Sequence, residues 1–175
     1  MKRDVPLWQF AGFAFTSLGG TVLHYLYEWS GESVLLAPFS GVNESVWEHM
    51  KLLYFPLFVF ALIQSRFFGD YEQFWCVKLR GIALGLLLIP VIFYTYNGAF
   101  GRSPDWLNIA IFFIAAAIVF LYETRSMQQD MTHCPKGAAL LIICLIGVLF
   151  VVFTFATPHL PLFKDPVNGT FGLSS

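Results

Sequence analysis

Charged residues are scarce in this chain. Asp, Glu, Lys and Arg make up 12% of its 175 residues, whereas hydrophobic residues make up 57%. A soluble domain usually carries about 25% charged residues, and the mean hydropathy here is +0.67. The composition therefore argues against an ordinary soluble domain and favours an integral membrane protein. The formal net charge of −1 leaves no basic excess for binding nucleic acid.

Cysteine and the common catalytic motifs are also sparse. The three cysteines, Cys76, Cys134 and Cys144, form no CxxC pair, which argues against a disulfide framework and against a thiolate metal site. Cys76 and Cys144 lie in apolar runs, where we expect them to act as small buried hydrophobic residues. The sequence contains no nucleophile motif, no glycine-rich phosphate loop and no cofactor signature. The enzyme classes that these motifs mark are therefore not indicated.

The chain has long apolar runs instead. A helix needs roughly 20 mainly apolar residues to cross a bilayer. The sequence predicts an all-α integral membrane helix bundle of about five transmembrane helices, in a single domain over residues 1–175. The expected spans cover about residues 7–27, 46–67, 74–96, 105–122 and 137–157, and a tail follows over 158–175.

Positive charge is distributed unevenly between the two sides of this bundle. The side of the N-terminus receives Lys2, Arg3, Arg66, Lys78, Arg80, Arg125 and Lys136, and the other side receives only Lys51, Arg102 and Lys164. The positive-inside rule then predicts a cytoplasmic N-terminus. With five spans the C-terminus lies outside. At the start of the third span we expect Lys78 and Arg80 to snorkel toward water.

This topology gathers ionisable residues on the outer face. They include three of the four histidines and six of the eleven acids, namely His24, His49, His159, Glu28, Glu32, Glu44, Glu48, Asp105 and Asp165. Ionisable groups near the membrane interior are costly, so their presence indicates a functional site. His24 and Glu28 are four residues apart and share a helix face, as do Glu44 and Glu48.

A set of histidines and glutamates suits three kinds of chemistry: a divalent metal such as zinc, a general acid–base pair, or proton-coupled binding. The metal interpretation makes His24, His49 and His159 ligands, and the catalytic residues would be Glu44 and Glu48. Other polar or aromatic residues of this face are assigned to substrate binding: Glu28, Asn43, Trp47, Lys51, Tyr94, Tyr96, Asn97, Asp105, Lys164 and Asp165.

Part of this pattern also has a purely structural explanation. Asn43 with Glu44, and Ser45 with Glu48, match the start of a capped helix. Lys51 would then neutralise one of the two acids. Tyr94 and Tyr96 fit an interfacial aromatic belt, and His24 with Glu28 fits a simple interfacial pair. Capping does not account for three histidines on one side.

The tail after residue 157 has its own signature. Three prolines prevent a continued helix, whereas Leu160, Leu162, Phe163 and Phe171 are apolar. We therefore expect the tail to pack as a lid over the outer ends of the helices.

Four runs carry a resemblance to a known family. They are LHYLYEWSG at 23–31, FSGVNESVWEHMK at 39–51, IFYTYN at 92–97 and PHLPLFKDP at 158–166. Together they resemble a bacterial family of small polytopic membrane proteins of unknown function, and the likeness spans nearly the whole chain. One departure is Gly41, where the family pattern leads us to expect proline. The resemblance implies a multi-pass protein of the cytoplasmic (inner) membrane and implies no reaction.

Three functions fit these observations. The first is a metal-assisted or acid–base membrane hydrolase. The second is a small-solute or ion transporter, or a binding subunit of one. The third is a structural or partner-binding membrane protein, whose outer face would be a docking surface. The expected partners are membrane lipid and a second copy of the chain or another membrane protein.

Overall fold

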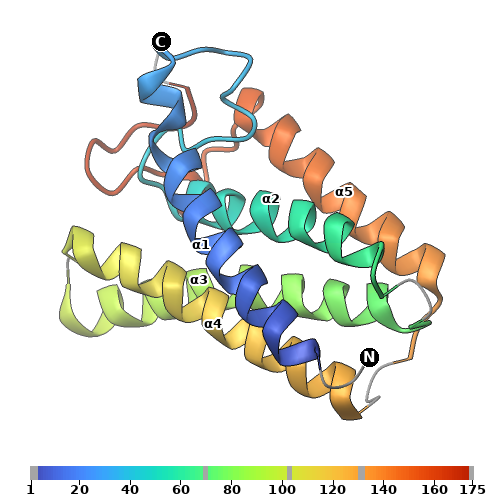
Figure 1. The fold of residues 1–175 in the computed structure, drawn as a ribbon. Helices are drawn as coiled ribbons and strands as arrows, with labels where there is room; N and C mark the ends of the chain where they lie inside the picture. The colour runs from blue at the N-terminus through green and yellow to red at the C-terminus, as the bar shows by residue number, and fades with distance from the viewer. Residues whose placement is uncertain (1–3, 69–70, 102–103, 130–132, 174–175) are drawn as a thin grey trace.

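The computed structural model describes residues 4–68, 71–101, 104–129 and 133–173. These residues form five α-helices and a short 3₁₀ helix (Figure 1). The helices are α1 (Val5–Trp29), α2 (Val46–Ser65), α3 (Phe74–Phe100), α4 (Asp105–Gln129), α5 (Lys136–Phe155) and η1 (Pro161–Phe163). The predicted all-α fold is confirmed, and each expected span coincides with one α-helix.

Four of the helices, α2 to α5, are long and apolar enough to cross a membrane, judged by length and composition. Large apolar side chains remain exposed on their outer surfaces, for example Leu87 on α3, Leu121 on α4 and Leu141 on α5. Such side chains suit contact with lipid. Helix α1 has 25 residues, which at 1.5 Å per residue is about 37 Å and long enough to cross. Its membrane crossing stays a prediction.

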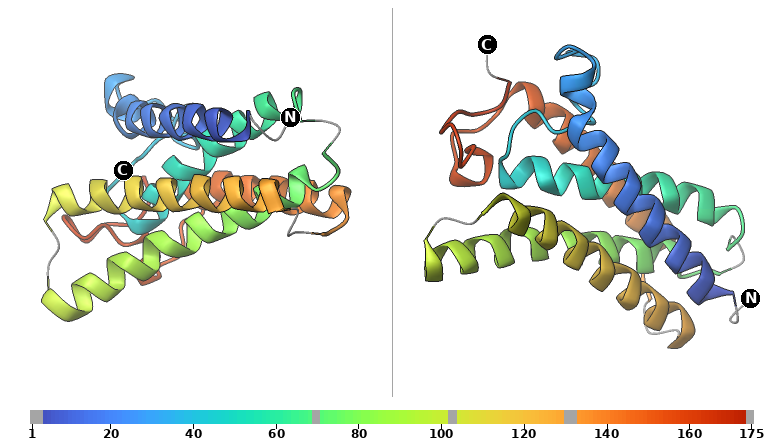
Figure 2. Two further views of the ribbon diagram at one scale, coloured as in Figure 1. Left: turned by 60° about the horizontal axis from the view of Figure 1, so that its bottom comes forward. Right: turned by 60° about the vertical axis from the view of Figure 1, so that its left-hand side comes forward.

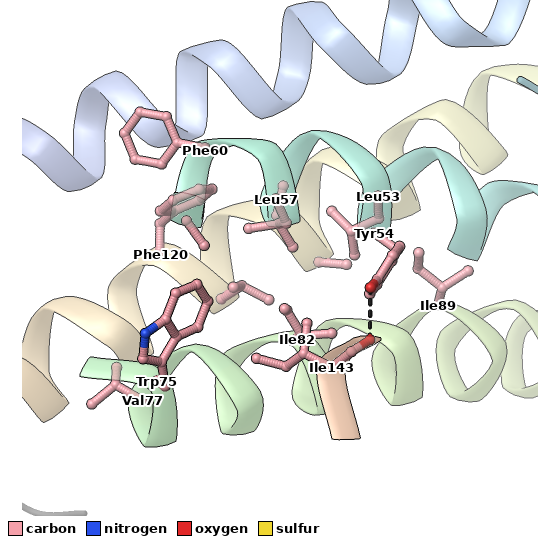
Figure 3. Packing of buried hydrophobic residues seen from close by; sticks show 14 of the residues in the cluster. Leu53, Tyr54, Leu57, Phe60, Trp75, Val77, Ile82, Ile89, Phe120 and Ile143 are labelled. Atoms are coloured by element: carbon pink, nitrogen blue, oxygen red, sulfur yellow. Dashed lines mark hydrogen bonds between the residues drawn. The ribbon is translucent and has the colours of Figure 1, made fainter. Parts of the chain in front are cut away.

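Helix α2 lies at the centre of the bundle. It packs against α1, α3 and α5, while α3 and α4 form a pair (Figures 1 and 2). Leu53, Leu57 and Phe60 of α2 point into the shared core (Figure 3). The Tyr54 hydroxyl donates a 2.7 Å hydrogen bond to the carbonyl of Ile143 on α5. This bond satisfies a buried hydroxyl and fixes α5 against α2.

Glycines let α1 approach its neighbours closely. A Cβ atom at Gly12 would lie 2.5 Å from ring atoms of both Phe60 and Phe120, and one at Gly20 would lie 2.4 Å from the ring of Phe112. These separations are far shorter than any normal carbon–carbon contact. Helix α1 therefore seats aromatic rings of α2 and α4 directly against its backbone.

The structure corrects the expectation for Lys78. Lys78 does not snorkel: it is 1% exposed and forms an ion pair with Glu123 of α4. The same pair accounts for the length of α4, which continues to Gln129, past the predicted end at Tyr122. Glu123, Ser126 and Met127 are buried, so one face of the last two turns of α4 belongs to the core.

The expectation of no disulfide was also wrong. Cys76 at the start of α3 and Cys134 before α5 are bonded, with their Cα atoms 5.8 Å apart. The two residues are separated by 58 positions, so only the fold brings them together and no local spacing could reveal the pair. Cys144 stays free and is exposed on α5, not buried as expected.

The tail packs as predicted. Phe163 of η1 is 4% exposed, and its ring lies 4.6 Å from that of Trp47 at the start of α2. The Asn43 side-chain amide donates a 3.1 Å hydrogen bond to the carbonyl of Gly172. The end of the chain is therefore held against the connector between α1 and α2, beside the end of α5 (Figure 1).

The disulfide lies on the side that the charge bias predicts to be cytoplasmic, where thiols are normally kept reduced. Exchange with a soluble thiol requires access to one of the sulfur atoms. Cys76 is 0% exposed, whereas Cys134 is half-buried, so burial shields one of the two sulfur atoms from such exchange.

The disulfide can be tested by counting thiols. Under denaturing conditions without reductant, we expect one reactive thiol per chain, from Cys144, and all three cysteines to react after reduction. In a matched Cys144→Ser variant the corresponding counts are zero and two. Alkylation followed by mass spectrometry measures both. Three reactive thiols before reduction would contradict the bond.

Candidate functional site

The strongest polar cluster joins the end of α1 to the start of α2. We call it the His–Glu–His cluster: His24 of α1, Glu44 of the connector, and His49 of α2. The Glu44 carboxylate lies between the two rings, 3.5 Å from Nε2 of His24 and 3.7 Å from Nε2 of His49. The ring centroids are 5.9 Å apart. From the sequence we expected imidazoles and carboxylates of the first, second and fifth spans to share one pocket; of these groups, His24, Glu44 and His49 meet here.

The connector returns sharply after α1 to bring Glu44 into place. Gly31 and Glu32 have φ values of 69° and 60°, a left-handed conformation that glycine adopts easily and glutamate adopts rarely. Farther along, the Gly41 amide donates a 3.1 Å hydrogen bond to the carbonyl of Leu23. This bond anchors the connector to α1 beside His24. A proline at position 41 would lack that donor.

Helix α2 starts at a well-formed cap. The Asn43 carboxamide oxygen accepts from the Ser45 amide at 2.9 Å, and the Ser45 hydroxyl accepts from the Glu48 amide at 3.4 Å. Ser45 is the N-cap, so the predicted capping pattern is confirmed. Ser45 lies between Glu44 and His49 in the chain. The cap therefore fixes the backbone that positions both side chains.

The tautomer of His49 follows from its hydrogen bond. Its Nδ1 lies 3.0 Å from the Ser45 carbonyl oxygen. A carbonyl only accepts, so Nδ1 must donate. In the neutral ring Nε2 is then an acceptor, and it faces the carboxylate of Glu44, which is also an acceptor. Two facing acceptors favour a proton, a cation or a donor group between them.

Two cavities meet at His24 and Tyr25. A polar cavity of about 260 Å³ lies between the end of α1 and the connector, and Glu28, Glu32 and Glu44 are among its lining residues. A smaller cavity of about 70 Å³ runs toward α4 and is lined mainly by apolar and aromatic side chains. Its aromatic lining consists of Tyr25, Phe112 and Phe113, besides the rings of His24 and His49.

The charged residues that line the polar cavity are all acidic. Three glutamates line it, and among the described residues neither lysine nor arginine does. Glu44 is 42% exposed, whereas His24 and His49 are 24% and 12% exposed. A solute can therefore reach the carboxylate from the polar cavity while the imidazoles stay largely sheltered.

Glu48 belongs to a different group from Glu44. Its carboxylate lies 2.6 Å from the Lys51 ammonium and accepts a 3.1 Å hydrogen bond from the Val42 amide. Lys51 also donates to the carbonyl of Ala37 and to the hydroxyl of Thr154, at 2.9 and 3.2 Å. Both charged side chains are buried. This group ties the connector, α2 and α5 together and leaves neither charge open to a solute.

The other residues predicted on this face divide in the same way. Glu28 and Asn43 line the polar cavity. Trp47 packs instead with Phe150 of α5 and with the tail, and Asp165 accepts hydrogen bonds from its own turn. Lys164 is exposed and pairs through its backbone with Phe171.

His159 does not join the other two histidines. Its ring packs against Phe171 of the tail, with centroids 4.8 Å apart. Among the described residues, no group of three or more His, Cys, Asp or Glu is arranged to hold a metal ion. The geometry of the described chain therefore supports an acid–base or binding site more than the three-histidine metal site.

The end of α3 lies away from the cluster. Tyr94, Tyr96 and Asn97 belong to its last two turns, which project with the start of α4 away from the connector (Figures 1 and 2). Asn97 donates a hydrogen bond to the Phe93 carbonyl in its own helix, and Tyr96 packs on Phe100. The side chain of Asp105 is outside the described residues.

Sequence reasoning missed several residues around the site. Thr154 of α5 supports Lys51, and Phe112 and Phe113 of α4 line the apolar cavity. No local signal marks them, because each sits in an apolar run and reaches the site only through helix packing. Tyr25 was within reach, since it is adjacent to His24.

Comparison with known families now adds one finding. A family model described as a family of unknown function (DUF6512) matches residues 2–173. The chain belongs to this family. Neither a curated protein nor a solved structure matches it. Membership of DUF6512 confirms the family resemblance seen in the sequence and assigns no activity, so the function must be argued from the site itself.

The buried Lys51–Glu48 pair predicts an asymmetric response to mutation. Lys51→Met leaves the Glu48 carboxylate buried without its cation, which we expect to destabilise the fold by about 3–5 kcal/mol. The double variant Lys51→Met/Glu48→Leu removes both charges and should recover most of this loss. Melting temperatures in one detergent compare the two variants with the unmodified protein. A double variant as unstable as the single one would contradict a coupled pair.

Proposed function

We propose that this DUF6512 protein binds a small organic cation at the His–Glu–His cluster, as a multi-pass membrane binding or transport protein. The single observation that carries the proposal is the polar cavity, which is lined by Glu28, Glu32 and Glu44 and by no described lysine or arginine. Such a cavity attracts cations and repels anionic solutes. On the orientation that the charge bias predicts, it faces the outside of the cell.

Glu44 is the anchor for the cation. Its carboxylate faces Nε2 of both His24 and His49 at 3.5 and 3.7 Å. An ammonium group beside the carboxylate would place positive charge between two acceptors, the Glu44 carboxylate and Nε2 of His49. If a proton occupies the same place instead, it must leave when the cation binds. The arrangement therefore supports binding that is coupled to proton release.

The aromatic lining favours an organic cation over a bare metal ion. Tyr25 lines both cavities, Tyr27 lines the polar one, and Phe112 lines the apolar one. Aromatic faces attract alkylammonium groups, and rings combined with carboxylates are the usual means of recognising quaternary ammonium compounds. The described residues offer no three-ligand metal group, so the organic class is the better match.

Choline and its uncharged isostere 3,3-dimethylbutan-1-ol test the proposal. Thermal unfolding of the purified full-length protein is measured with each compound at equal concentration. We expect choline to raise the melting temperature and the neutral isostere to leave it unchanged, because a ligand that binds only the folded state stabilises it. Glu44→Gln should abolish the choline effect. Glu72→Gln, in the connector before α3, is the matched control and should retain it.

Equal responses to choline and to the alcohol would contradict recognition of charge, as would a choline effect that survives Glu44→Gln. A third arm uses zinc chloride. Stabilisation by zinc that disappears in both His24→Ala and His49→Ala, without any choline effect, would favour the metal site over the organic cation.

A hydrolase is the second candidate, and the orientation of His49 favours it. Because Nδ1 donates to the Ser45 carbonyl, Nε2 is set to accept a proton from a water molecule, as a general base does. Acetylcholine offered to the reconstituted protein distinguishes the two functions. A hydrolase releases choline, and His49→Gln abolishes the release. A binding or transport protein leaves the ester intact.

A further inference from the structure

A second polar group lies in the half of the bundle nearer the N-terminus, and the proposed function does not use it. The Lys78 ammonium of α3 and the Glu123 carboxylate of α4 are 2.5 Å apart. Both side chains are at most 1% exposed, and both helices are apolar enough to cross a membrane. Charged side chains buried within apolar helices are costly and commonly mark proton or ion pathways.

Three aromatic rings surround the ammonium. Nζ of Lys78 lies 5.9, 5.5 and 5.8 Å from the ring centroids of Phe60, Phe74 and Phe120. A ring within about 6 Å attracts a cation through its negative face. The ammonium therefore has a second set of partners, which can hold it when the carboxylate is neutral.

Several buried polar atoms nearby lack a hydrogen-bond partner. They are Oε1 of Glu123, Oγ of Ser126, both amide atoms of Gln64 and Oε1 of Gln9. Each of these residues is at most 2% exposed. Because buried polar atoms are nearly always hydrogen-bonded, this concentration points to small polar ligands such as ordered water or a proton.

These atoms come from helices that meet at the ion pair. Ser126 follows Glu123 by three residues on the same face of α4. The Gln9 amide of α1 donates to the Met127 sulfur at 3.3 Å. Gln64 lies four residues after Phe60 on α2, and therefore on the face that meets Lys78. A cavity of about 360 Å³ between α1 and α4 is lined in part by Gln9 and Phe120 and opens on the protein surface.

Gly81 of α3 gives the free carboxylate oxygen its space. A Cβ atom there would lie 2.6 Å from Oε1 of Glu123, closer than any normal contact. One oxygen of Glu123 therefore pairs with Lys78, and the other packs against the backbone of Gly81, where any larger residue would displace it.

We propose that Glu123 is a proton-binding site. A proton delivered by water forms an O–H bond on Glu123, the ion pair with Lys78 breaks, and the ammonium stays between the three rings. The site then changes from neutral to a net charge of +1, and release of the proton to water restores the pair. Among the described residues, Lys78 is the charged group that faces Glu123, and α1 and α2 contribute Gln9, Gln64 and Phe60.

Infrared difference spectroscopy tests the proposal on the full chain in lipid. The spectrum is recorded as the pH is lowered from mildly alkaline to mildly acidic values, with the glutamate side chains carrying ¹³C carboxyl groups. We expect a protonated-carboxyl C=O band to appear, and Glu123→Gln should remove it. Glu72→Gln is the matched control and should keep the band. Glu123→Asp retains a carboxyl group and should shift the band.

A labelled protein that develops no protonated-carboxyl band overturns the proposal, because Glu123 then does not change its protonation state over this pH range. A band that survives Glu123→Gln overturns it as well. If Glu123→Gln fails to fold, Glu123→Asp and the labelled unmodified protein still decide the question. Choline stabilisation should persist in Glu123→Gln. Failure of the proton-binding proposal and failure of the proposed cation site at the His–Glu–His cluster can therefore be told apart.

Discussion

The position of the His–Glu–His cluster depends on the buried ammonium of Lys51. One side chain bonds to Glu48 in its own helix, to the Ala37 carbonyl of the connector and to the Thr154 hydroxyl of α5. A charge in an apolar bundle has to be satisfied from several directions. By meeting that need, Lys51 fixes the connector against α2, and the connector carries Glu44 to the histidines.

Among the charged residues that the structure describes, Lys51 with Glu48, Glu44, and Glu123 differ in how completely they are satisfied. Lys51 has three partners and its acid has two, so this group is closed and structural. Glu44 is partly exposed between two imidazoles, and Glu123 keeps one oxygen free. A charged group that lacks part of its hydrogen-bond or ion-pair partners is costly. Such a group is expected where a ligand or a proton supplies the missing partner. This difference is the ground on which we propose functional roles for Glu44 and Glu123.

The helices, and the placement of His24 and His49 near helix ends on one side of the bundle, could be predicted because they depend on local sequence patterns. Apolar runs mark α2 to α5, and Asn43 with Ser45 marks the start of α2. Glu123 could not be placed, because it follows Tyr122 at what seemed the end of a span, and only Lys78 from another helix keeps it buried. The Cys76–Cys134 bond was missed for the same reason, since its partners meet only through the fold.

The central claim is that His24, Glu44 and His49 form one ligand-binding point. Nitrogen-15 NMR of the imidazole rings, in protein labelled at its four histidines, tests it most directly. We predict that Glu44→Gln and added choline each shift the signals of His24 and His49 and leave those of His133 and His159 in place. Unchanged signals from His24 and His49, or equal shifts at all four histidines, would contradict the claim.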